Sequence, residues 1–226
     1  MKRLFLALFL GTLTFSCSSD SSSGSSLSDT PTAKSEYDSS NYGIYKGVFV
    51  GSTGTVLINI KNEGTLSATL TIDGTASTYT SSETVTLATA IEGLTFTNGS
   101  SSFDFNVSAV GGNAAISNIN ISGHPNANID IVKEYSNSLV KCYVGTFTGD
   151  SSGALNLIIK GNVLYGLAKP SDDNNSVLLS GSLTGTTIAG GWENGTFIGT
   201  ASGNSMSGTW QNTFSESGSW SGTRKL

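Results

Sequence analysis

The chain has 226 residues, including 28 Gly, 38 Ser and 27 Thr, with only 12% charged residues and a formal net charge of −5. Because Gly, Ser and Thr favour turns and strands, this composition excludes a protein built from long helices. The acidic balance, without a basic stripe, argues against nucleic acid as a partner, while 37% hydrophobic residues are enough for a folded core.

The first 16 residues have the pattern of a secretory signal peptide. Lys2 and Arg3 precede an apolar stretch, residues 4–13, that is too short to remain as a membrane span. Small residues then lead to Cys17 and a Ser-rich segment, and at this point the chain resembles a bacterial lipoprotein of the Bacteroidota type. The resemblance implies a signal peptide over 1–16 and acylation of Cys17, for example with palmitate. An ordinary signal peptide cleaved elsewhere is the alternative.

The segment over 17–41 is Ser-rich and of low complexity. It has too few apolar residues to offset the entropy of ordering it, so we predict a disordered tether between the membrane and the folded part. With Cys17 lipidated, Cys142 would have no disulfide partner. We expect Cys142 to be a small buried or half-buried residue at the start of a strand.

An internal repeat divides the remaining chain. Both halves contain Y-x-G-x-F-x-G followed by a similar strand: 45–51 with 143–149, and 54–61 with 153–160. Generic hairpins could converge on such a pattern, but two similar strands in the same order favour a duplicated module. We therefore predict a first β module over 42–136 and a second over 137–226.

Strand-like runs separated by turn residues recur through the first module. We predict nine strands there: 45–51, 54–61, 65–72, 75–80, 83–90, 93–97, 102–109, 114–122 and 127–134. The only histidine, His124, lies in a Gly-His-Pro-Asn sequence that is typical of an exposed turn.

The second module shows the same pattern more regularly. We predict eight strands: 143–149, 153–160, 163–169, 176–183, 186–192, 195–201, 205–211 and 218–224. Asn-Gly and Gly-Asn pairs suit tight hairpins, and the connections are too short for crossover helices. An all-β fold of two antiparallel meander modules follows, with the second an up-and-down barrel or a rolled sheet.

Glycine alternates with large apolar residues along the strands of the second module. Because alternate residues of a strand point to the same side, one face is apolar and the other is covered by Ser, Thr and Asn. A Gly two places from an aromatic residue allows sharp curvature and lets a neighbouring ring cover the gap. The G-x-W strands at 208–210 and 218–220 are similar to those of avidin-like and calycin-like barrels, a resemblance that implies the architecture and no binding residue.

Few residues could support catalysis. A nucleophilic triad would need His124, and a metal site would need more His or Cys than the sequence has, so we expect no cofactor and no metal. Paired carboxylates could act on glycans, with four candidates: Asp104, Asp130, Glu134 and Glu193. Strand parity places these carboxylates mainly on solvated faces. The acidic run 172–175 could offer oxygen ligands to Ca²⁺, but it lacks EF-hand spacing and fits a hairpin tip better.

Trp192, Trp210 and Trp220 are the best binding candidates. They share the apolar face of the second module and could stack on a sugar or flank a hydrophobic ligand. They could equally fill the interior of a small barrel. The leading prediction is a lipid-anchored protein of the outer membrane, on its periplasmic or surface side, with a non-catalytic binding or structural role. A calycin-like barrel for a small hydrophobic ligand or sugar is the alternative, and a glycan hydrolase is a more distant one.

Overall fold

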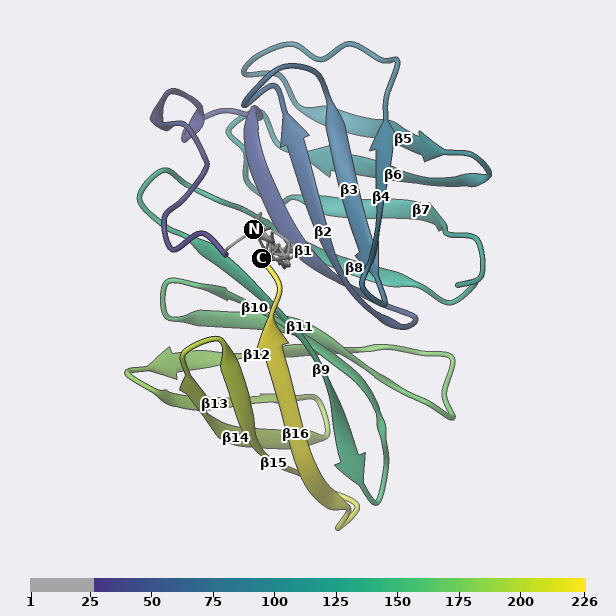
Figure 1. Ribbon diagram of the computed structural model, residues 1–226, viewed down its shortest axis with the longest axis vertical. Helices are drawn as coiled ribbons and strands as arrows, with labels where there is room; N and C mark the ends of the chain where they lie inside the picture. Colours follow the sequence, from purple (N-terminus) through teal and green to yellow (C-terminus); the bar gives the residue numbers. More distant parts are fainter. Residues whose placement is uncertain (1–26) are drawn as a thin grey trace, which may run out of the picture.

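The structure, a computed structural model, describes residues 27–226 and consists almost entirely of antiparallel strands (Figure 1). Sixteen strands form two sheets of eight, and a single 3-10 turn at Ser35–Tyr37 precedes them in the described part of the chain. The predicted all-β fold of two meander modules is therefore confirmed. The predicted signal peptide over 1–16 and Cys17 lie outside the described residues. None of the helical turns within 27–226 has the length and apolar character needed to cross a membrane.

The strand bounds follow the predicted runs closely, especially in the second half. The first sheet consists of β1 Gly43–Val50, β2 Thr53–Ile60, β3 Ser67–Ile72, β4 Thr75–Thr80, β5 Ile91–Asn98, β6 Ser101–Val107, β7 Ala115–Asn120 and β8 Asn128–Lys133. The second sheet consists of β9 Val140–Gly149, β10 Gly153–Lys160, β11 Val163–Pro170, β12 Val177–Thr184, β13 Thr187–Trp192, β14 Gly195–Ser202, β15 Ser205–Asn212 and β16 Ser217–Arg224.

The two sheets have the same topology. In each, strands are neighbours in chain order, and the first strand also pairs with the last, β1 with β8 and β9 with β16. The opening hairpins share one register, because Tyr45 lies opposite Ile58 as Tyr143 lies opposite Leu157. These equivalences confirm the predicted two-module repeat at the level of structure.

The sheets differ in closure. In the second sheet the ladders continue around all eight strands, so it is a closed barrel. In the first sheet β4 and β5 share one pair, Thr80 with Thr97, and β7 and β8 lie close together without a ladder. The first module is therefore a rolled, nearly closed sheet, and only the second is an up-and-down barrel.

The predicted strand over 83–90 is wrong: this stretch is a loop. Its backbone groups are bonded by side chains instead of by a neighbouring strand. The Asn41 amide donates to the Thr86 carbonyl (2.8 Å) and accepts from the Ala88 N–H (2.8 Å), and the Tyr42 hydroxyl donates to the Val85 carbonyl (3.0 Å). Alternating Val and Thr residues predict a strand locally, but these side chains offer the backbone a different set of partners.

Each sheet encloses its own hydrophobic core. The first core is rich in fully buried rings, among them Tyr45, Phe49, Phe96, Phe103 and Phe105. In the barrel, the predicted inward face is confirmed, since Phe147, Leu179, Ile188, Phe197, Met206, Trp210 and Trp220 are all buried in one cluster.

Inward-facing glycines make room for the rings of the barrel. A Cβ on Gly199 would lie 2.5 Å from the Trp220 ring, and one on Gly218 would lie 2.6 Å from Nε1 of Trp210. In the barrel, aromatic rings thus occupy the space that the glycines leave, as the Gly-x-aromatic pattern of the sequence predicts.

The later part of the predicted tether over 17–41 lies against the folded modules. The Thr32 N–H donates to the Glu134 carboxylate (2.8 Å), and Asp29 pairs with Arg224 near the end of the chain (2.7 Å). The prediction of disorder therefore fails for this part. The prediction was based only on the small apolar area that this segment can bury, whereas specific hydrogen bonds to the folded modules order it.

The two modules pack directly against each other (Figure 1). A small apolar cluster fills the junction: Val48, Val140, Cys142 and Ile158. Beside it, the buried Asn156 amide donates to the Phe49 carbonyl across the junction (2.6 Å). Cys142 has no exposed surface, as predicted for a buried residue, and this burial raises the pKa of its thiol to about 12.

Candidate functional site

A cavity of about 160 Å³ lies inside one end of the barrel. Its lining residues lie on strands β9 to β15 toward the end of the barrel where β9, β11, β13 and β15 finish, together with Ser151 and Glu216 from the turns after β9 and β15. At the other end, large buried side chains fill the interior: Tyr143, Ile159, Leu164, Ile188 and Met206. The barrel is thus packed at one end and hollow at the other.

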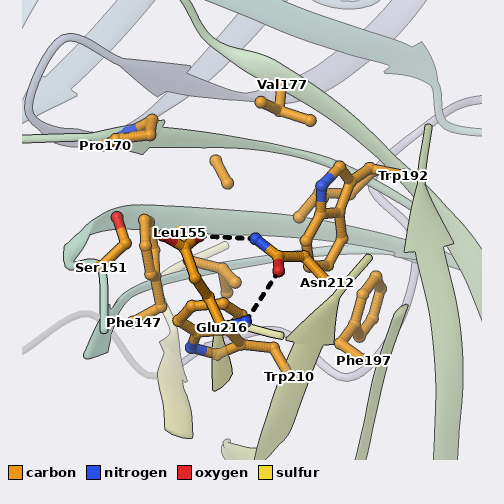
Figure 2. A pocket seen from close by; sticks show the side chains of 12 residues that line it. Phe147, Ser151, Leu155, Pro170, Val177, Trp192, Phe197, Trp210, Asn212 and Glu216 are labelled. Carbon is orange, nitrogen blue, oxygen red and sulfur yellow. Dashed lines mark hydrogen bonds between the residues drawn. The ribbon is translucent and has the colours of Figure 1, made fainter. Parts of the chain in front are cut away.

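The cavity wall is mostly apolar. Figure 2 shows the residues that surround it, ten of them labelled. The apolar residues are Phe147, Leu155, Ala168, Pro170, Val177, Leu179, Trp192, Phe197 and Trp210, and the polar residues are Ser151, Asn212 and Glu216. An apolar pocket with a few polar groups at its edge is the usual form of a small-molecule site.

Four aromatic rings give the cavity its shape (Figure 2). The Phe147 and Trp210 rings are perpendicular, with centroids 5.9 Å apart, and the Trp192 ring is tilted by 58° at 6.4 Å from Trp210. Nε1 of Trp210 donates to the Thr148 carbonyl (3.1 Å). Because this indole N–H already has a partner in the barrel wall, Trp210 contributes apolar surface to the cavity.

The polar edge of the cavity is the turn between β15 and β16. The Asn212 amide donates to a Glu216 carboxylate oxygen (2.6 Å) and accepts from the backbone N–H groups of Phe214 and Glu216, both at 3.0 Å (Figure 2). Asn212 therefore holds the turn. Within residues 27–226, Glu216 has no ion-pair partner, and no Lys, Arg or His lines the cavity. The fixed charge at this site is negative.

The structure separates the three predicted tryptophans. Trp192 and Trp210 both line the cavity, Trp192 half-buried at the mouth and Trp210 deeper. Trp220 does not line it. The Trp220 ring is 2% exposed, meets Phe197 edge-on at 6.0 Å and donates its N–H to the Ile198 and Thr209 carbonyls (both 3.2 Å). Trp220 fills the barrel interior.

Three of the four candidate carboxylates are scattered over the molecule, and none of them lines the cavity. Asp104 accepts hydrogen bonds from Thr95 (2.7 Å) and Asn118 (2.7 Å) on the first sheet. Asp130 lies on β8, where burial raises the pKa of its carboxyl group. Glu193 is exposed in the turn between β13 and β14.

Glu134 is a completely buried carboxylate, which corrects the expectation of a solvated side chain. It accepts hydrogen bonds from the Lys46 ammonium (2.5 Å), the Thr32 N–H (2.8 Å) and the Val140 N–H (3.0 Å). These partners belong to β1, the N-terminal segment and β9. Glu134 therefore connects three parts of the chain, and its contacts are those of a residue that stabilises the fold.

His124 lies in a turn, as predicted, but it is half-buried. Its ring packs edge-on against Phe49, with centroids 5.3 Å apart, so packing accounts for its position. The run 172–175 is the exposed tip of the β11–β12 connection. Within the described part of the chain, no group of three or more His, Cys, Asp or Glu residues could hold a metal ion.

Sequence reasoning missed several cavity residues. The position of Phe147 at the hollow end depends on how the strands are staggered around the barrel, which the strand pattern of 143–149 does not give. Pro170 and Glu216 carry no sequence signal for a site, since both stand at strand ends where turn residues are ordinary. The position of Pro170 and Glu216 beside the cavity results only from closure of the barrel.

Comparison with models of protein families finds no family that matches this chain, and comparison with curated proteins finds no match.

Proposed function

We propose that this is a lipid-anchored protein of the cell envelope with a non-catalytic binding role, and that its barrel binds a small molecule at the hollow end. The cavity that Trp192 and Trp210 help to line is the observation that supports binding. An eight-stranded barrel has an interior that side chains can just fill or that can hold one small ligand, and here one end is left unfilled. The proposal therefore favours the ligand-binding alternative over a structural role.

The cavity volume limits the ligand. About 160 Å³ is close to the ~150 Å³ of an apolar cavity that accepts benzene, and it is below the range of ~300–1,000 Å³ for drug-sized ligands. One ring, or one compact branched group, can enter between the aromatic walls. A larger molecule would leave the rest of its body outside the mouth.

A hydrolytic role has less support. Glycoside hydrolysis uses two carboxyl groups about 5–9.5 Å apart across the substrate. Among residues 27–226, Glu216 is the only carboxylate that lines the cavity, and the four carboxylates considered from the sequence do not line it. With one carboxylate and no histidine at the site, binding without chemistry fits better.

Tryptophan fluorescence provides the test of binding, because all three tryptophans lie in the barrel. We expect at least one member of a panel of single-ring apolar compounds, short branched alcohols, small organic ammonium ions and monosaccharides to shift the emission saturably. The shift should weaken in Trp192→Ala and persist in the matched control Trp220→Phe. If no panel member shifts the emission or raises the melting temperature, the proposed binding role is wrong.

The proposed anchor has its own test. Cys17→Ala should move the protein from the membrane fraction to the soluble fraction after cell lysis, because the acyl chains are then absent. Ser18→Ala is the matched control and should stay with the membrane. Membrane association of the Cys17→Ala protein would contradict the lipoprotein assignment.

A further inference from the structure

The electrostatics of the cavity restrict the ligand further than its size does. The faces of Trp and Phe rings carry negative quadrupole potential, and four such rings surround this space: Phe147, Trp192, Phe197 and Trp210. The perpendicular arrangement of Phe147 and Trp210 leaves a space bounded by rings in more than one plane. A compact, rounded group fits such a space better than a flat ring, which would need parallel walls.

The electrostatic potential at the polar edge of the cavity is negative, as it is at the ring faces. Glu216 accepts one hydrogen bond from Asn212 and has no cationic partner in the described part of the chain. A carboxylate has about four lone-pair sites, so Glu216 can still face a ligand charge. An anionic ligand would meet repulsion here, and an uncharged one could gain only a hydrogen bond from a donor group of its own.

The cavity offers few hydrogen-bond acceptors, and this favours a quaternary ammonium over a primary ammonium as the ligand. A primary ammonium loses three hydrogen bonds to water on entry. Among the polar side chains that line the cavity it would find the Ser151 hydroxyl and the Glu216 carboxylate, since the Asn212 amide oxygen already accepts two backbone N–H groups. A quaternary ammonium has no N–H groups to satisfy, and its methyl groups suit apolar walls. Aromatic cages around quaternary ammonium groups are a known use of cation–π attraction.

From the ring arrangement, the unpaired carboxylate and the scarcity of acceptors, we infer that the barrel cavity is a site for small quaternary ammonium compounds, with the trimethylammonium group in the space that the four aromatic rings line. This inference rests on the proposed binding function and names its ligand class.

The test compares choline with 3,3-dimethyl-1-butanol, in which carbon replaces the charged nitrogen at nearly the same shape. Fluorescence titration of the full chain should show choline binding about tenfold or more tightly than the alcohol, as expected when a cation lies on several desolvated rings. Equal affinities, or tighter binding of the alcohol, would overturn the ammonium inference and leave the binding function intact.

Variants of Glu216 and Glu193 test whether the Glu216 carboxylate contributes to binding of the cation. Glu216→Gln should weaken choline binding about three- to tenfold and leave the alcohol unchanged, since only the cation senses the carboxylate. Glu193→Gln, which makes the same change in an exposed turn at the same barrel end, is the control and should bind both as the parent does. If choline and the other ammonium ions of the panel fail while an uncharged compound binds, the ammonium inference is wrong; if nothing binds, the proposed function fails too.

Discussion

The buried ion pair between Glu134 and Lys46 gives the sharpest prediction about stability. The Glu134 side chain is fully buried and that of Lys46 is 7% exposed, with 2.5 Å between ammonium and carboxylate. Glu134→Gln keeps the shape but leaves the ammonium without a counter-ion, and its amide can satisfy fewer of the donors that converge there. Breaking a buried pair in this way costs about 3–5 kcal/mol, so we expect a loss of that size in the free energy of unfolding.

Urea unfolding, followed by circular dichroism for both modules and by tryptophan fluorescence for the barrel, measures this loss. Glu63→Gln is the control, because it makes the same change in the exposed Lys34–Glu63 pair and should cost less than about 1 kcal/mol. Adding Lys46→Met to Glu134→Gln removes the stranded charge and should recover part of the loss. A cost below about 1 kcal/mol for Glu134→Gln, or no recovery in the double variant, would refute the reasoning.

Three further predictions follow from packing and burial. Gly199→Ala should cost about 1–3 kcal/mol in urea unfolding because its Cβ would overlap the Ser207 carbonyl oxygen and lie 2.5 Å from the buried Trp220 ring, whereas Gly222→Ala, whose nearest neighbour is 3.5 Å away, should cost less; equal losses would contradict this packing. In a Cys17→Ser background, the Cys142 thiol, its pKa raised to about 12 by burial, should resist a thiol reagent at pH 8 until urea unfolds the protein; rapid labelling of the native state would refute its burial. Burial lowers the pKa of Lys133 from 10.5 to about 8, so between these values the unfolded state binds more protons and stability from this group rises with pH. Urea midpoints should therefore increase more from pH 7.5 to 9.5 in the parent than in Lys133→Met, and parallel pH profiles would show that the lysine titrates normally.

Much of the fold could be predicted from local sequence, because strand formation here depends on local signals. Alternation of apolar and polar residues, with Asn-Gly and Gly-Asn turns, predicts all eight strands of the barrel near their observed bounds. The Gly-x-aromatic pattern also predicts the inward face, since residues two apart in a strand point to the same side of the sheet. Where local and tertiary signals conflict, the prediction fails: 83–90 looks like a strand, yet Asn41 and Tyr42 bind its backbone in a loop.

The candidate site was only partly predictable. The strand pattern is enough to place Trp192, Trp210 and Trp220 on the inward face, because side chains alternate along a strand. Which of them meet a cavity depends on the folded barrel, because the stagger of strands around a closed barrel sets the height of each ring along the axis. The same closure brings Glu216, an ordinary turn residue in the sequence, to the edge of that cavity. The side of the sheet to which a residue points depends on its own strand. Its depth in the interior and its neighbours depend on how the strands close into the barrel.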